Sequence, residues 1–250
     1  RKRATVEAFL HVLKDGIIGQ EASSFQLYDM GSGTGNLILP LTWWLREMGF
    51  EDMNAVAVDR NNRSLELLEE RASTLPIESL CIDMNEISDL SPSAVVVSLH
   101  ACGIASDLAL KTAVESSLPF VISPCCIGKV KSAWEKVERQ SDLTYPRSTW
   151  LRNQLAESAQ YSLLASAADF GFTPTSFVSP EEWQRRERCR KAKTTVETDR
   201  LKWATETADY CVHMFDITGL DESYAKRELL VGAPRNSLAA QSLANFALRL

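Results

Sequence analysis

The stretch Tyr28-Asp29-Met30-Gly31-Ser32-Gly33-Thr34-Gly35-Asn36 decides the fold, because its three glycines separate an apolar run from an amphipathic one. This order predicts a strand, a tight loop and the start of a helix. Glycine lets the backbone approach a ligand closely, and the first amides of the following helix point at that ligand. The spacing is G-x-G-x-G and differs from the G-x-G-x-x-G of nicotinamide dinucleotide sites. The loop therefore predicts a site for a large polar ligand, which its context must identify.

Acidic side chains end the next two predicted strands. Asn54–Asp59 has the pattern of a buried strand, and its terminal carboxylate comes 24 residues after Gly35. At this place in a doubly wound sheet, a carboxylate can accept two hydrogen bonds from ribose hydroxyls. Leu80–Asn85 gives a third strand end, where Asp83 can accept a hydrogen bond from the exocyclic amine of an adenine while Met84 packs on the ring. The three strand ends together predict a nucleoside site.

These strand ends resemble the first three motifs of class I S-adenosylmethionine-dependent methyltransferases, with Asp29, Asp59 and Asp83 in successive motifs. The alternative is a Rossmann-like domain with an ordinary glycine turn and surface acids. The resemblance implies S-adenosylmethionine as cofactor and S-adenosylhomocysteine as product. The residues that it implies for cofactor binding are Asp29, Gly31, Ser32, Gly33, Gly35, Asn36, Asp59, Arg60, Asp83, Met84, Leu99 and His100.

Repeated strand-helix units predict an α/β fold in which parallel strands are joined by right-handed crossovers. The β-branched run Ala94–Leu99 is typical of a strand that is buried on both faces. With the resemblance, the expected fold is a Rossmann-like, mostly parallel seven-stranded sheet with helices on both faces and a charged helical insertion. We expect one domain over residues 1–250. Its parts are a leading helix and linker (1–24), a core (25–180), the insertion (181–208), and a terminal strand and helix (209–250).

Several segments outside this repeat have a weaker pattern. Val6 to Leu13 has helical spacing, Trp150 to Phe170 predicts a long helix, and Phe172 to Val178 predicts a strand. We expect Trp43 and Trp44 to anchor the helix after the glycine loop to the sheet.

Composition describes an ordinary globular protein that can bury a full core, with 250 residues, 45% apolar, 24% charged and a net charge of -6. No apolar run approaches the roughly 20 residues needed to cross a bilayer, so no membrane partner is expected. The six cysteines do not have the spacing of a secreted disulfide framework, which favours a reducing intracellular compartment, cytoplasmic before organellar. The chain begins at Arg1 without a methionine, and we expect an additional amino-terminal domain outside it.

Two more strand ends carry side chains that could take part in catalysis, and the sheet should place them side by side where a substrate enters. They are Ser98–Leu108, with His100-Ala101-Cys102-Gly103 at its centre, and Ser123–Gly128, with Pro124-Cys125-Cys126. This two-part motif resembles the methyltransferase domain of the glutathione S-transferase C-terminal domain-containing proteins. It is more distantly similar to a eukaryotic tRNA 2′-O-methyltransferase family. The resemblance spans about residues 25 to 234. The candidate catalytic residues are His100, Cys102, Cys125 and Cys126.

Each of these residues has more than one interpretation. His100 could remove the proton of a hydroxyl acceptor, since the unperturbed pKa of histidine is about 6.5, or it could be a core histidine bonded to a carbonyl. The three cysteines with His100 have the composition of a zinc site, but adjacent Cys125 and Cys126 point to opposite faces of an extended chain. The cysteines could instead be buried structural thiols, or one of them could be a thiolate activated by His100. We therefore expect no metal.

A basic cluster lies in the predicted insertion: Arg185, Arg186, Arg188, Arg190, Lys191 and Lys193. It could contact RNA phosphates while Trp183 stacks on a base, or it could be a solvated helix face. Our leading hypothesis is a methyltransferase that acts on RNA, with tRNA favoured by the family resemblance. The alternatives are a protein or small-molecule methyltransferase and a non-catalytic module that binds the donor as a scaffold.

Overall fold

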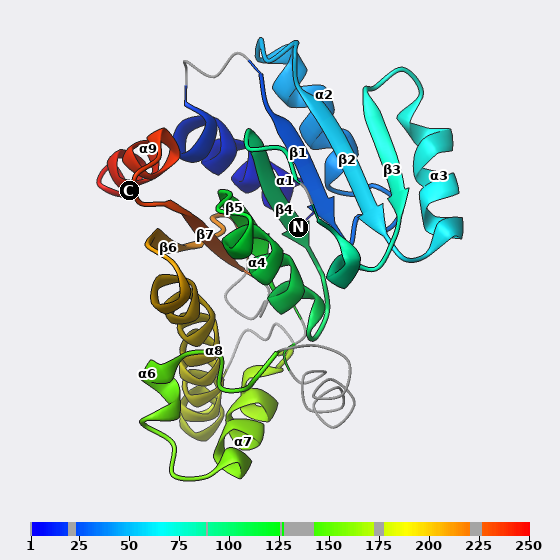
Figure 1. The fold of residues 1–250 in the computed structure, drawn as a ribbon. Helices are drawn as coiled ribbons and strands as arrows, with labels where there is room; N and C mark the ends of the chain where they lie inside the picture. The colour runs from blue at the N-terminus through cyan, green and yellow to red at the C-terminus, as the bar shows by residue number, and fades with distance from the viewer. Residues whose placement is uncertain are drawn as a thin grey trace.

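The glycine-rich stretch follows the first strand of a central sheet, β1 (Gln26–Met30), as expected (Figure 1). The structure is a computed structural model that describes residues 2–19, 24–88, 90–125, 127, 143–172, 178–220 and 227–250. In this part of the chain, seven strands form one sheet in the order β3-β2-β1-β4-β5-β7-β6. The other strands are β2 (Asn54–Asp59), β3 (Ile77–Cys81), β4 (Ala94–Leu99), β5 (Phe120–Ser123), β6 (Tyr210–Asp216) and β7 (Glu228–Pro234).

The strand directions bring the predicted ligand-binding ends to one edge. β1 pairs in parallel with β2 and β4, and β2 with β3 and β4 with β5 pair in the same way. β7 runs antiparallel to β5 and to β6. The carboxyl ends of β1 to β5 therefore share one edge, beside the start of β7. The expected mostly parallel, seven-stranded Rossmann-like sheet is confirmed.

Helices cover both faces of this sheet. One face carries α1 (Lys2–His11), the π-helix Val12–Ile18, α2 (Ile38–Glu47), α3 (Asn62–Ala72) and α9 (Leu238–Ala247). The other carries α4 (Ala105–Glu115) and the carboxyl-terminal part of α8 (Pro180–Thr207). β4 explains the two layers, because Val95 and Val97 pack into the first core and Val96 packs into the second.

A third apolar core joins α6 (Thr149–Arg152), α7 (Ser158–Ala168) and the amino-terminal half of α8. Figure 1 shows these helices grouped beyond the strand ends, with α8 continuing up to β6. α8 therefore connects the helical group to the sheet. Within the described residues, no helix combines the length and the apolarity that a membrane crossing requires.

Five details differ from the sequence expectations. The leading helix starts earlier and continues as a π-helix, and the long helix predicted from residue 150 to 170 is wrong, since α6 and α7 are separate. β3 ends at Cys81, so Asp83 and Met84 lie beyond it, where Asp83 caps a short 3-10 turn, Met84–Glu86. Phe172 and Val178 are not in a strand, and residues 173–177 lie outside the described chain. Trp43 and Trp44 do not anchor α2, because their side chains are 44% and 45% exposed.

Candidate active site

The glycine loop forms a cradle at the carboxyl end of β1. Gly33 has a φ of 53°, and a Cβ atom added to it would meet no atom within 4 Å, so space is open above it. Gly35 has a φ of 81°, and a Cβ there would approach Leu39 and Leu68 within 2.8 to 2.9 Å. One glycine therefore leaves room for a ligand and the other lets the helix pack closely. Both roles are expected of the glycines in a nucleotide-binding turn.

Asp59, at the end of β2, lies directly beside this cradle. Its Oδ2 accepts a hydrogen bond from the Gly33 amide at 2.9 Å, and its Oδ1 accepts one from the Asn61 amide at 2.8 Å. Each carboxylate oxygen has two lone pairs, so both can still accept a bond from a ribose hydroxyl. The loop and the predicted ribose acceptor, 26 residues apart, are thus brought together.

Asp29 is the buried acid beneath the loop, with 1% of its surface exposed. Its Oδ2 has no hydrogen-bond partner among the described residues. Burial raises the pKa of this carboxyl to about 8, and the nearby negative charge of Asp59 adds to the rise, while the backbone amide of Ile38 opposes it. A buried carboxyl with one unpartnered oxygen favours a cationic group beside it. S-adenosylmethionine is a cation, so the residues of this cradle fit it.

The third motif lies next to the same loop. Asp83 caps the 3-10 turn, and its Oδ1 accepts bonds from the backbone and side-chain nitrogens of Asn85 at 3.0 and 2.9 Å. The Met84 methyl group lies 3.3 Å from the position of a Cβ on Gly31. An apolar side chain and an acid therefore border the cradle, where the sequence predicts the adenine.

The other predicted cofactor residues lie around this edge. The Ser32 amide bonds to the Val58 carbonyl at 3.0 Å, and its buried hydroxyl has no partner in the described chain. Arg60 follows β2, and Leu99 ends β4 opposite Ser123 of β5. Asn36 precedes α2 and lines a cavity described below. These roles in cofactor binding stay predictions.

The candidate catalytic residues meet at the ends of β4 and β5. His100 is exposed and has a φ of 61°, and its amide bonds to the Ser123 carbonyl at 3.3 Å. The thiols of Cys102 and Cys125 are 3.0 Å apart, with Cys125 buried. Cys126 lies outside the described residues. An exposed imidazole next to a donor cradle can accept a proton from a bound hydroxyl, which is the role expected of a general base.

No group of three or more His, Cys, Asp or Glu residues that could hold a metal occurs in the described part of the chain. Cys126, one member of the zinc alternative, is not among the residues compared.

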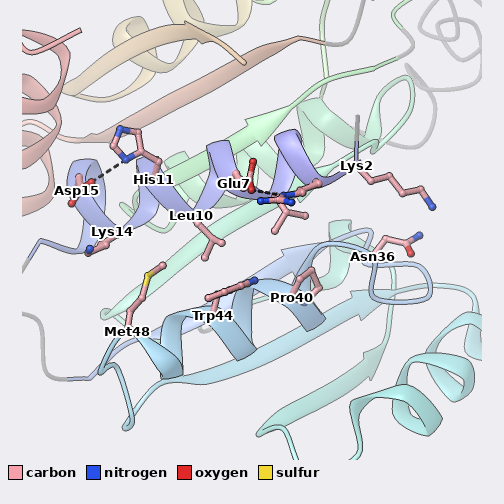
Figure 2. Close-up of a pocket in the computed structure, with 12 residues that line it drawn as sticks. Lys2, Glu7, Leu10, His11, Lys14, Asp15, Asn36, Pro40, Trp44 and Met48 are labelled. Atoms are coloured by element: carbon pink, nitrogen blue, oxygen red, sulfur yellow. Dashed lines mark hydrogen bonds and ion pairs between the residues drawn. The ribbon is translucent and has the colours of Figure 1, made fainter. Parts of the chain in front are cut away.

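A cavity of about 780 Å³ runs between α1 and α2 (Figure 2). Its floor is apolar, and Trp44 of α2 and Met48, just after that helix, line it. Lys2 and Lys14 lie at its two ends, and Asn36 connects it to the glycine loop. Sequence reasoning missed this groove. Its signal is the four-residue spacing of Pro40 and Trp44, which places both on one face of α2.

The basic cluster of α8 is only partly available to a ligand. Arg185 and Arg186 bond to Glu182 at 3.2 and 3.0 Å, and Lys191 bonds to Glu187 at 2.8 Å. Arg188 and Trp183 are exposed. The expectation that Lys193 contacts phosphates is wrong, because its side chain is 1% exposed and held by carboxylates. Those carboxylates belong to α8 itself and to β7.

Lys193 belongs to a buried ionic network that ties α8 to the catalytic edge. Its Nζ lies 2.9 Å from Glu197 and 3.3 Å from Glu228, the first residue of β7. Arg200 bonds to Glu197 at 2.9 Å and clamps both oxygens of Asp107 at 2.8 and 2.9 Å. Burial alone would raise the pKa of Asp107, but Arg200 and then Arg147 hold it below its usual value. Sequence reasoning missed this network, although positions 193, 197 and 200 share one helix face.

Comparisons with known proteins agree with this geometry. A family model described as a methyltransferase domain matches residues 1–133. The glutathione S-transferase C-terminal domain-containing protein of Xenopus laevis is 27% identical over 210 residues, which cover 83% of this chain and 31% of that protein. Its Drosophila melanogaster homologue is 26% identical over 236 residues, covering 93% of this chain and 36% of that protein. The chain thus spans about a third of the length of these relatives.

Two solved structures are similar at low identity. The methyltransferase domain of bacterial CtHen1-C is 14% identical with a TM-score of 0.49, covering 94% of this chain and 99% of that one. The plantazolicin methyltransferase BpumL in complex with SAH is 10% identical with a TM-score of 0.44, covering 99% of this chain and 77% of that one. The family model itself spans more than half of the chain. This chain therefore belongs to the methyltransferase-domain family, a family of S-adenosylmethionine-dependent enzymes with the class I fold.

Proposed function

We propose that this domain methylates RNA, with tRNA favoured, and that the acceptor is a hydroxyl whose proton His100 removes. The observation that carries the proposal is the placement of exposed His100 at the same sheet edge as the Gly33–Asp59 cradle. An in-line displacement requires a donor and a nucleophile held together, and it requires a base when the nucleophile is a hydroxyl.

The roles of the residues follow from their positions. Gly33 and Asp59 would hold the nucleoside of the donor, and Asp29 would lie near a cationic group of it. When bound, S-adenosylmethionine supplies the electrophilic methyl group. His100 would accept the hydroxyl proton as the new bond forms, since neutral imidazole is a base at physiological pH.

Three features support RNA as the acceptor. The motif of His100 and Cys102 with Cys125 is similar to that of a tRNA 2′-O-methyltransferase family. Arg188 and Trp183 are exposed on α8, beyond the strand ends. The α1–α2 cavity adds Trp44, which could stack on a base, and a lysine at each end.

The test is transfer of a labelled methyl group from S-adenosylmethionine to separated RNA, protein and metabolite fractions. We expect label in RNA, and label only in protein would eliminate the RNA proposal. A double variant, Arg185→Ala with Arg188→Ala, should weaken RNA binding. The slope of the logarithm of the binding constant against the logarithm of salt concentration should become shallower by about 0.7 per lost phosphate contact. Lys202→Ala, at the other end of α8 and also exposed, is the matched control and should bind RNA like the wild type.

A protein or small-molecule acceptor is the second candidate function, favoured by one observation. Arg185, Arg186 and Lys191 are already paired with glutamates of their own helix, which weakens their attraction for phosphate. In that case the double arginine variant should leave turnover unchanged.

A non-catalytic scaffold is a further alternative. Binding of the donor by calorimetry with no transfer to any fraction would favour it.

A further inference from the structure

Two thiols that the methyl-transfer chemistry does not require lie in contact at the catalytic edge. Cys102 follows β4 and Cys125 follows β5, and their sulfur atoms are 3.0 Å apart. The parallel pairing of Leu99 with Ser123 holds these strand ends side by side. Both cysteines are reduced thiols in the structure. A disulfide has a sulfur–sulfur length of about 2.05 Å, so the bond requires the two atoms to approach by about 1 Å.

We propose that Cys102 and Cys125 form an oxidation site, which a hydroperoxide converts into an intramolecular disulfide. The partly exposed Cys102 reacts first, because Cys125 is only 5% exposed. The Cys102 thiolate attacks the peroxide oxygen, the O–O bond breaks, and sulfenic acid and water form. The Cys125 sulfur then attacks the sulfenic sulfur, and the hydroxyl leaves with the Cys125 proton as a second water. Two thiols are oxidised, one hydrogen peroxide is reduced, and the protein loses two hydrogen atoms.

The position of the pair gives the disulfide a consequence for the site. Cys102 is two residues from His100, so closing the sulfur gap shifts the loop that carries His100 toward β5. A displacement of about 1 Å in a reacting group can cost about 100-fold in rate. The donor cradle is formed by Gly33, after β1, and Asp59, at the end of β2, and neither residue belongs to this loop. We therefore expect oxidation to slow methyl transfer and to leave donor affinity unchanged, an effect that rests on the proposed function.

The chemical test does not depend on activity. The folded protein is treated with hydrogen peroxide, then denatured, alkylated and mapped by mass spectrometry. We expect four alkylated cysteines instead of six, a Cys102–Cys125 cross-link, and its loss on treatment with dithiothreitol. Cys102→Ser and Cys125→Ser should abolish the link, whereas Cys81→Ser and Cys126→Ser should retain it. Six alkylated cysteines in the treated wild type, or a link from Cys102 to Cys126, would overturn the proposal, and neither result requires a variant to fold.

The activity arm compares reduced and oxidised wild type in the labelled-methyl assay. We expect up to about 100-fold slower transfer after oxidation, with the donor Kd from calorimetry unchanged. Cys81→Ser, whose thiol lies exposed at the end of β3, should show the same loss. A cross-linked protein with an unchanged rate would refute the effect on catalysis. A protein that cross-links but transfers no methyl group in either state would refute the proposed function and leave the oxidation site standing.

Discussion

At the residue scale, Asp29 links the stability of the fold to pH. Its pKa is raised to about 8 by burial, so between about pH 4 and pH 8 the folded chain binds a proton that the unfolded chain releases. The free energy of unfolding therefore falls as pH rises through this window, at about 1.4 kcal/mol per pH unit from this group. Urea unfolding at pH 5, 6 and 7 should show this slope in the wild type and its loss in Asp29→Asn. The exposed control Asp52→Asn should follow the wild type. Parallel profiles for Asp29→Asn and the wild type would contradict the assignment.

His100 is the second residue whose role a single change can test. Its φ of 61° is a conformation that asparagine tolerates better than alanine, so His100→Asn removes the base and keeps the backbone. We expect transfer to a hydroxyl acceptor to slow by about 100-fold to 10,000-fold, while the donor Kd changes little. The control is His213→Asn, on β6 at the far edge of the sheet. A full rate for His100→Asn would make His100 a structural residue.

At the element scale, α8 is held to the sheet by charges that its sequence presents as surface residues. Lys193 is buried between Glu197 and Glu228, and Lys191, two positions earlier, is exposed. Lys193→Met leaves Glu228 without its cation and Glu197 with Arg200 alone, which should lower the free energy of unfolding by about 3–5 kcal/mol. Lys191→Met should change it by less than about 0.5 kcal/mol. Equal urea midpoints for the two variants would show that the network does not hold α8.

The elements also show which patterns could be read directly. β4 was predictable because a β-branched run that is buried on both faces is typical of a central strand in a parallel sheet. α9 was predictable because it begins after Ser237, whose hydroxyl caps it. The 21 residues from 150 to 170 were not, because apolar spacing alone cannot locate the break between α6 and α7. A capping box of Glu157 and Gln160 marks the start of α7. This local signal is not visible when only the spacing of apolar residues is considered.

At the scale of the whole molecule, the donor should stabilise the fold, since it binds the folded chain and not the unfolded one. At 100 times its Kd, the gain is about 2.7 kcal/mol, which corresponds to a rise in Tm of about 5–10 °C for a chain of this size. Thermal unfolding with S-adenosylhomocysteine measures this rise. Asp59→Ala should reduce it at the same ligand concentration, because the ribose acceptor is lost.

The matched control for this measurement is Glu69→Ala, on the exposed face of α3, which should keep the full rise in Tm. An equal rise for Asp59→Ala would mean that the nucleoside lies elsewhere. ATP is the ligand control, since a general nucleotide site would respond to it and a methyl-donor site should not.

The sequence by itself determined the glycine loop, the acids at the strand ends and the parallel sheet, because each depends on residues close together in the chain. Only the tertiary structure decided the partners of distant side chains. Asp107 and Arg200 are 93 positions apart and share two hydrogen bonds, and the thiols of Cys102 and Cys125 meet across two strands. The physical reason is that periodicity reports which face of an element is apolar, whereas the burial of a charge or a thiol depends on what the rest of the chain places opposite it.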